Sequence, residues 1–190
     1  MENIWEAIDP NGLLSEVSRQ AWEKIMRRKE YKKDEFFIMQ DEVPTRMAFV
    51  SKGLFSKYFI SGSGKLVIST FYPENNFMCF SLPYMEASPS RYAIIAVEDS
   101  VVWEYDPNEW ETRLGEQLDV AIMSKKYVEK RFEIEQNHGS VIHCDSMGRI
   151  RYLHFLKDYP KIVSRLKDFE IAAYLHITVD RLREIRAELN

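Results

Sequence analysis

The residues best suited to chemistry lie near the carboxyl end, in the segment 168–189, DFEIAAYLHITVDRLREIRAEL. A helix-turn-helix needs a small residue where its two helices cross and apolar residues that wedge them at a fixed angle. With Ala172 as the small residue, apolar residues fall at the required offsets: Ile171, Leu175, Ile177, Leu182 and Ile185. The alternative is a pair of helices that only packs and contacts no ligand.

In this interpretation Thr178 caps the second helix, whose first turns face a DNA major groove. Arginine and aspartate side chains there meet base edges or phosphates. The predicted DNA-binding residues are Thr178, Val179, Asp180, Arg181, Arg183 and Glu184. His176 occupies the turn, where a left-handed residue, usually glycine, is expected, so we predict strain on the order of 1 kcal/mol.

Enzyme chemistry finds little support in the residue pattern. The four histidines (His138, His143, His154 and His176) all follow residue 137, outside the predicted sheet, so a metal-dependent enzyme with ligands inside a barrel is disfavoured. The two cysteines, Cys79 and Cys144, are too few for a four-thiolate zinc site or an iron–sulfur cluster. We predict no catalytic residues, no metal and no resident cofactor, although a small-molecule effector is compatible with the sequence.

Composition is that of an ordinary globular protein, with 190 residues, 45% apolar and 29% charged. The net charge is −4, but residues 145–190 carry nine Lys/Arg and seven Asp/Glu, whereas residues 1–144 carry a balance of −6. An acidic body with a mildly basic tail indicates two modules with different partners. With no long apolar run and no signal-peptide pattern, we expect a cytoplasmic protein that does not contact membranes.

The elements that must position these residues change in character along the chain. Residues 13–30 show helical apolar spacing, which predicts a short N-terminal helix or helix pair. Between residues 34 and 106, short apolar runs alternate with turn clusters, a pattern typical of an antiparallel sandwich or jelly roll: EFFIM, MAFVS, LFSKYFI, KLVISTFY, YAIIAV and VVWEY.

A long helix is predicted from Asp106-Pro107 to about residue 142, because aspartate suits the N-cap and proline the first helical position. Its incomplete apolar stripe comprises Leu114, Leu118, Ala121/Ile122, Val128, Phe132 and Ile142. The stripe fits either a helix packed on its own sheet or the seam of a parallel dimer. A further helix through Ile150, Leu153 and Leu156, capped by Asp145 or Ser146, is expected before Tyr159-Pro160.

With these elements in this order, the chain resembles the Crp/Fnr family of transcriptional regulators, in a short branch without a C-terminal wing. The segments that carry the resemblance are YKKDEFFIMQDE (31–42), FVSKGLFSKYF (49–59), Gly64-Lys65, FYPENNF (71–77), IIAVEDS (94–100), Met147-Gly148-Arg149-Ile150 and IAAYLHIT (171–178).

The resemblance implies an α+β fold in three parts. These are N-terminal helices with a cyclic-nucleotide-binding-like β-roll (1–106), a long dimerisation helix (107–144) and a small helix-turn-helix domain (145–190). It further implies a homodimer through residues 107–142 that binds palindromic double-stranded DNA, with an effector pocket in the β-roll.

The expected effector pocket departs from that of the family's cyclic-nucleotide binders. A Gly-Glu pair that holds the ribose corresponds to Cys79-Phe80, and an Arg-Ser/Thr pair on the cyclic phosphate corresponds to Ser90-Arg91, one residue late. The hydroxyl pair of the long helix corresponds to Ile134-Glu135. The expected pocket residues are Cys79, Phe80, Ser81, Ser90, Arg91, Ile134 and Glu135.

Two functional hypotheses follow. The first is a DNA-binding transcriptional regulator that does not respond to cyclic AMP. The second is a dimeric regulatory or protein-interaction module whose DNA-binding region is vestigial, because Glu184 replaces a guanine-reading arginine of the family and His176 strains the turn.

Overall fold

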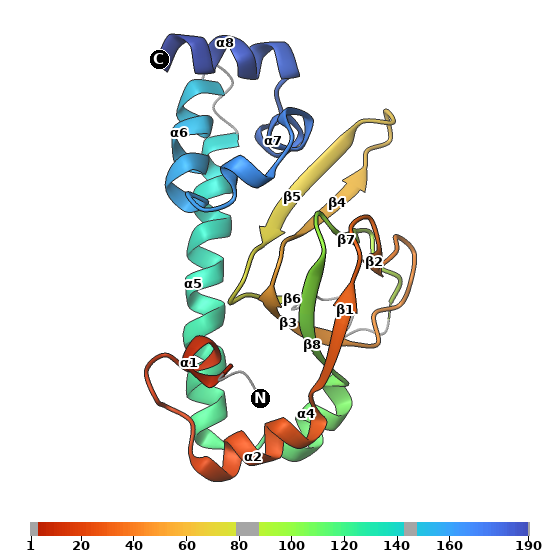
Figure 1. The fold of residues 1–190 in the computed structure, drawn as a ribbon, viewed down its shortest axis with the longest axis vertical. Coiled ribbons are helices and arrows are strands. Elements are labelled where there is room, and N and C mark those ends of the chain that lie inside the picture. The colour runs from red at the N-terminus through yellow and green to blue at the C-terminus, as the bar shows by residue number, and fades with distance from the viewer. Residues whose placement is uncertain (1–3, 79–87, 143–147, 190) are drawn as a thin grey trace. The chain divides into compact units, whose positions relative to one another are not determined.

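The computed structural model describes residues 4–78, 88–142 and 148–189, with the backbone alone for 134–142. Two short helices, α1 (Trp5–Ile8) and α2 (Glu16–Ile25), come first (Figure 1). The strands are β1 (Arg27–Tyr31), β2 (Phe36–Ile38), β3 (Met47–Lys52), β4 (Phe55–Ile60), β5 (Leu66–Tyr72), β6 (Phe77–Met78), β7 (Ala93–Ala96) and β8 (Ser100–Tyr105). The later helices are α4 (Pro107–Leu114), α5 (Leu118–Ile142), α6 (Gly148–Asp158), the 3-10 turn η1 (Val163–Arg165), α7 (Asp168–Leu175) and α8 (Val179–Leu189).

The strands form two four-stranded sheets, with the orders β1-β8-β3-β6 and β2-β7-β4-β5. The pairs β1/β8, β3/β8, β3/β6 and β2/β7 are antiparallel. Apart from β4 and β5, which are consecutive, neighbours in the sheets are distant in sequence, as in a β-roll rather than a simple meander. The predicted α+β fold class, with an N-terminal helix, an antiparallel β-roll, a long helix and a terminal helix-turn-helix, is confirmed.

The chain divides into two compact units. The larger unit contains residues 1–57 and 71–128, and the smaller unit contains residues 58–70 and 129–190. The tip of the β4–β5 hairpin therefore groups with the C-terminal helices, a grouping that the sequence did not indicate. The division into three functional parts, with boundaries after residues 106 and 144, stays a prediction.

The first sheet of the larger unit is covered on both faces, which explains the continuous apolar run in β3. Ala48 and Val50 point to the second sheet, where they join a core of side chains with exposures of at most 7%. Phe49, between them, points to the opposite face and packs in a second core with the N-terminal helices. Since successive strand residues alternate between faces, both sets must be apolar when both faces are covered.

Trp22 of α2 is the centre of the second core. It is 2% exposed, and its ring lies 5.9–6.1 Å from the rings of Trp5, Phe77, Tyr105 and Trp110. Such aromatic pairs add about 0.5–1.5 kcal/mol each to the free energy of area burial. This cluster holds the N-terminal helices, the β-roll and α4 together.

The expected helix start at Asp106 is confirmed. The Asp106 carboxylate accepts hydrogen bonds from the backbone N–H groups of Asn108 at 2.7 Å and Glu109 at 3.4 Å, and Pro107 occupies the first helical turn. The long helix is nevertheless broken after Leu114. A Cβ at Gly115 would lie 2.6 Å from the carbonyl oxygen of Glu111, so the glycine permits a close turn between α4 and α5.

The helix predicted within residues 13–30 is present as α2, but it ends at Ile25, and Arg27–Tyr31 form β1 instead. Because β1 is an edge strand, its first four side chains are exposed and show no apolar alternation. Val17, assigned to the apolar stripe, is 72% exposed.

None of the helices in the described ranges combines the length and the hydropathy that crossing a membrane requires.

We predict that Trp22→Ala lowers the free energy of unfolding of the larger unit by about 3–5 kcal/mol, because it removes the centre of the aromatic cluster. Trp5, Trp103 and Trp110 also lie in this unit, so urea unfolding followed by tryptophan fluorescence reports on it specifically. The control is Lys24→Ala, at an exposed residue of the same helix, expected to change stability by less than about 0.5 kcal/mol. A loss below about 1 kcal/mol for Trp22→Ala would contradict this description of the core.

Candidate functional site

The helix-turn-helix predicted for the C-terminal region is present. Ile171, Leu175, Leu182 and Ile185 are completely buried, and Ala172 is 3% exposed between α7 and α8. Ile177 is half-buried. The apolar side chains thus wedge the two helices as the spacing predicted.

The turn between the helices is closed by a left-handed residue. His176 has φ 56° and ψ 38°, and its backbone N–H donates to the carbonyl of Ala172. The N–H of Ile177 donates to the same carbonyl at 3.0 Å. The predicted left-handed conformation of His176 is therefore confirmed.

The His176 imidazole is half-buried in the smaller unit. Burial lowers its pKa below the ordinary value of 6.5, and the positive charges of Arg151 and Lys65 lower it further. The imidazole therefore favours the neutral form in the folded protein.

The start of α8 carries the predicted DNA-binding residues. The hydroxyl of Thr178 accepts a hydrogen bond from the backbone N–H of Arg181 at 3.2 Å, as expected for an N-cap. Val179 is half-buried, and the side chains that project outward from this end of α8 are exposed: Asp180, Arg181, Arg183 and Glu184. The structure therefore brings all six together at one end of one helix.

The two exposed arginines are held by carboxylates of the same region. Arg181 lies 2.8 Å from Glu184 and 3.2 Å from Glu188, and Arg183 lies 3.4 Å from Asp180. Exposed ion pairs of this kind contribute about 0–1 kcal/mol, so phosphate groups can replace the carboxylates at low energetic cost. Glu184 is thus an ion-pair partner of Arg181.

Arg186 fixes the orientation of α8 and was not identified from the sequence. Its Nη1 donates to Asp168, at the start of α7, at 2.6 Å, and its Nε donates to the Tyr152 hydroxyl of α6 at 3.1 Å. Burial lowers the pKa of Arg186, but the hydrogen bonds to Tyr152 and Asp168 outweigh it and raise the pKa. One guanidinium therefore ties three helices together.

A buried polar cluster joins strand β5 to the helices of the smaller unit. The Thr70 hydroxyl, 4% exposed as a residue, accepts from Arg131 of α5 at 2.9 Å and lies 3.3 Å from the Tyr159 hydroxyl. The Tyr159 ring packs edge-on against Tyr174, 5.7 Å away, and burial, together with Tyr159, raises the pKa of Tyr174. These residues are too distant in sequence for spacing to reveal the cluster.

The expected effector pocket is assembled only in part by the described residues. Ser90 is buried, and its hydroxyl donates to the carbonyl of Tyr92 at 2.8 Å and accepts from the N–H of the same residue at 3.2 Å. Arg91 is exposed, and both residues lie in the loop before β7 rather than in a strand, so the alternation expected for a strand does not apply to them. Cys79, Phe80 and Ser81, and the side chains of Ile134 and Glu135 in α5, lie outside the described part.

Helix α5 has two apolar faces. Val120 and Met123 are buried and Tyr127 is half-buried against the core of the larger unit. The opposite face exposes large apolar side chains, with Leu118 75%, Ile122 42%, Val128 46% and Phe132 61% exposed. The inner face thus packs on the protein's own core, whereas the predicted stripe residues from Leu118 to Phe132 are exposed, and their role as a dimer seam stays a prediction. Within the described ranges, no group of three or more His, Cys, Asp or Glu side chains is placed to hold a metal.

Comparisons with known proteins support the fold. Residues 28–116 match the family model described as "Cyclic nucleotide-binding domain". No curated protein matches the sequence. Among solved structures, FixK2 from Bradyrhizobium japonicum is 19% identical, with a TM-score of 0.72 over 87% of this chain and 84% of that chain.

Two further structures show the same likeness. A CooA mutant from Carboxydothermus hydrogenoformans is 16% identical, with a TM-score of 0.73 over 98% of this chain and 83% of that chain. A crp/fnr family transcriptional regulator from Eubacterium rectale is 16% identical, with a TM-score of 0.69 over 96% of this chain and 84% of that chain. The resemblance to the Crp/Fnr regulators is therefore confirmed for the fold.

We predict that the C-terminal helices lose stability as the pH falls below about 6.5, because the unfolded chain then binds a proton that the folded His176 takes up only at lower pH. NMR titration of the imidazole should give a pKa below 6.5. His176→Asn, which keeps a residue tolerant of the left-handed conformation, should remove this contribution to the pH dependence of thermal unfolding. A pKa at or above 6.5 would contradict the burial described here.

Proposed function

We propose that this chain, which has a cyclic nucleotide-binding domain and the fold of the Crp/Fnr regulators, is a homodimeric, DNA-binding transcriptional regulator that acts in the cytoplasm. The observation that carries the proposal is the start of α8. Arg181 and Arg183 are exposed there, on a helix whose angle is set by completely buried wedge residues. A helix presented in this way can enter a major groove with its first turns on the base edges.

Dimerisation is supported by the outer face of α5. Its exposed apolar side chains recur at intervals that keep them on one side of the helix, while the inner face is already occupied by the β-roll core. Two copies paired in parallel along this face place two α8 helices in a two-fold arrangement. The DNA that such a dimer recognises is a palindrome with half-sites about one helical turn apart.

The arginines of α8 suit phosphate as well as base contacts. Their present partners are exposed carboxylates on α8 and, for Arg183, the half-buried Asp168 on α7. The exposed ion pairs contribute little free energy. Binding of DNA would exchange them for phosphates and release counterions, so the affinity must depend on salt. Asp180 and Glu184 remain available to accept from cytosine amino groups.

The effector domain is proposed to respond to a ligand other than cyclic AMP. The Ser90 hydroxyl is bonded to the backbone of its own turn, and Arg91 is exposed to solvent. By the resemblance, Phe80 stands where a carboxylate holds the ribose, and Glu135 would oppose a phosphate. None of these features favours a cyclic phosphodiester.

Signal transmission would be a two-state change in which pocket occupancy or dimer geometry sets the spacing of the two α8 helices. The Thr70–Arg131–Tyr159 cluster is a suitable participant. It combines residues of β5, α5 and the end of α6, close to the points at which the chain passes between the two units.

We predict that cyclic AMP does not bind with useful affinity, because the carboxylate and the arginine that hold it in the family are absent or displaced. Isothermal titration calorimetry of the purified protein with cyclic AMP should give no heat of binding at micromolar concentrations. A dissociation constant of micromolar or tighter would contradict this assignment of the pocket.

We predict that the double variant Arg181→Ala/Arg183→Ala loses both affinity for duplex DNA and part of its salt dependence. The slope of log K against log salt should fall by roughly one for each phosphate contact removed. The measurement is fluorescence anisotropy with a labelled random-sequence duplex at two salt concentrations.

The matched control is Arg28→Ala/Arg113→Ala, which removes two exposed arginines that are also paired with glutamates and changes the net charge equally. It should leave DNA binding unchanged. Equal binding by the α8 variant and the wild type would place DNA affinity elsewhere. If even the wild type does not bind at low salt, the protein-interaction module becomes the better hypothesis.

A further inference from the structure

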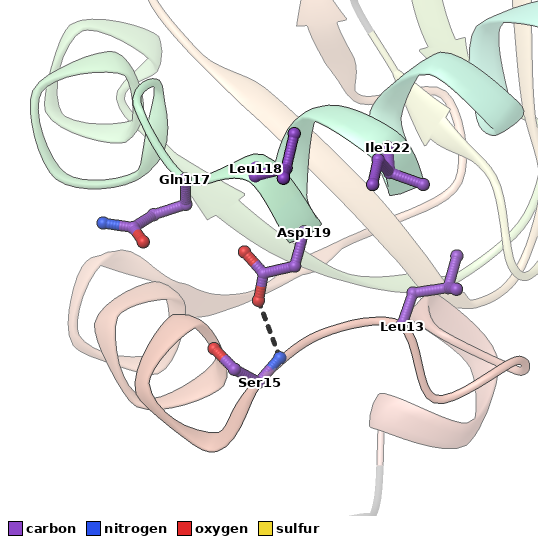
Figure 2. A pocket seen from close by; sticks show the side chains of 6 residues that line it. All are labelled: Leu13, Ser15, Gln117, Leu118, Asp119 and Ile122. Atoms are coloured by element: carbon purple, nitrogen blue, oxygen red, sulfur yellow. Dashed lines mark hydrogen bonds between the residues drawn. The ribbon is translucent and has the colours of Figure 1, made fainter.

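A shallow depression of about 400 Å³ lies beside the first turn of α5, entirely within the larger unit. Figure 2 shows the side chains that line it, drawn from the loop before α2 and from the start of α5. They are Leu13, Ser15, Gln117, Leu118, Asp119 and Ile122. We call these six residues, together with Val17 of the adjoining first turn of α2, the basal surface.

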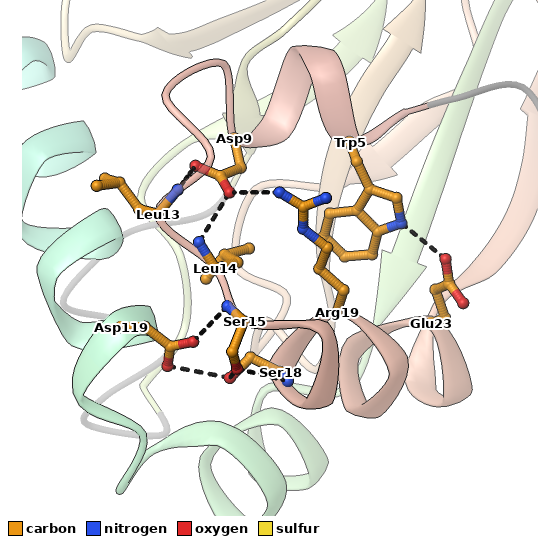
Figure 3. A network of polar contacts seen from close by, with 9 residues as sticks. All are labelled: Trp5, Asp9, Leu13, Leu14, Ser15, Ser18, Arg19, Glu23 and Asp119. Atoms are coloured by element: carbon orange, nitrogen blue, oxygen red, sulfur yellow. Dashed lines mark hydrogen bonds and ion pairs between the residues drawn. The ribbon is translucent and has the colours of Figure 1, made fainter.

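The basal surface has a fixed shape because its polar groups are bonded to one another. The Asp119 carboxylate accepts from the Ser15 N–H at 2.7 Å and from the Ser18 hydroxyl at 3.0 Å (Figure 3). Burial raises the pKa of Asp119, but these hydrogen bonds outweigh it and hold the pKa at about 2. The loop before α2 is thereby fastened to α5.

A second carboxylate orders the same loop from inside. The Asp9 side chain is 1% exposed, accepts from the backbone N–H groups of Leu13 and Leu14 at 2.8 Å each, and pairs with Arg19 at 3.2 Å (Figure 3). A loop held by a buried carboxylate loses little further entropy when a partner binds. The basal surface is thus preorganised.

Large apolar side chains of the basal surface are turned to solvent. Leu118 is 75% exposed and Val17 is 72% exposed, the highest values among the exposed large apolar side chains of the described residues. Leu118 and Ile122 also begin the outer apolar stripe of α5. The depression is therefore continuous with the face through which the dimer is proposed to form.

We propose that the basal surface is covered by the basal surface of a second copy, so that the N-terminal loop and the start of α2 extend the dimer interface beyond α5. This inference rests on the proposed homodimer. In a parallel two-fold pair, equal positions of the two α5 helices lie side by side, so the two basal surfaces meet.

The chemistry of the lining suits contact with itself. A two-fold axis brings like residues together, and a lining of free charges would repel its own copy. The one charged side chain that lines the depression, Asp119, has both oxygens engaged by Ser15 and Ser18. Gln117 carries an amide that both donates and accepts, so it can pair with its own counterpart.

The test measures the dimer dissociation constant of the full chain by sedimentation equilibrium. Leu13→Asp and Val17→Asp should each weaken the dimer on the order of tenfold or more, because each places two carboxylates in an apolar interface. The control Val43→Asp, at an exposed valine in the loop between β2 and β3, should leave the constant unchanged. Tryptophan emission reports whether the larger unit stays folded. If Leu13→Asp changes the tryptophan emission, the dimer dissociation constant of Val17→Asp, at the more exposed residue, decides whether the inference holds.

Phe132→Asp on α5 separates this inference from the proposed dimer. If Phe132→Asp weakens the dimer while Leu13→Asp and Val17→Asp do not, the seam is confined to α5, the basal surface serves another partner, and the inference is overturned. If the wild type is monomeric, or if Phe132→Asp has no effect, the proposed α5 dimer itself fails and this inference fails with it.

Discussion

The structure depends on helix α5 being apolar on two sides. Its inner face is committed to the aromatic core through Val120 and Met123, which fixes the helix against the β-roll. The outer face carries Leu118, Ile122 and Phe132 in exposed positions. Because a contiguous exposed apolar stripe is unfavourable in water, it calls for a second surface. The proposed dimer, and with it the two-fold presentation of α8, follows from this constraint.

In the helical region proposed to contact DNA, strong interactions hold the helices in place and weak interactions hold the exposed arginines. Completely buried side chains and the Arg186 guanidinium set the angle of α8, and these are expensive to disturb. The outward arginines are held mostly by exposed carboxylates of α8, which are inexpensive to displace. The scaffold is therefore rigid, and the groups that meet a ligand are free to exchange partners.

Features that depend on local spacing were predictable from the sequence. The helix-turn-helix, the Asp106 cap and most strands follow from apolar periodicity and capping, because these patterns span few residues. Strand β1 was not predictable, since Arg27–Tyr31 lie at a sheet edge and have no apolar alternation to detect. The Thr70–Arg131–Tyr159 cluster and the Ser15–Asp119 contact join residues 61 to 104 positions apart, and neither has a local signature. The part of the candidate site that lies on one helix could thus be predicted from the sequence, whereas the part built by tertiary contacts could not.

The most direct test of the central claim is selection from a pool of random duplexes with the purified protein at two salt concentrations, followed by sequencing of the retained DNA. We expect a palindrome whose half-sites are about one helical turn apart, with retention that falls as salt rises. Retention without an enriched motif would show contact with the DNA backbone alone. No retention at low salt would contradict a DNA-binding function and direct the search to protein partners.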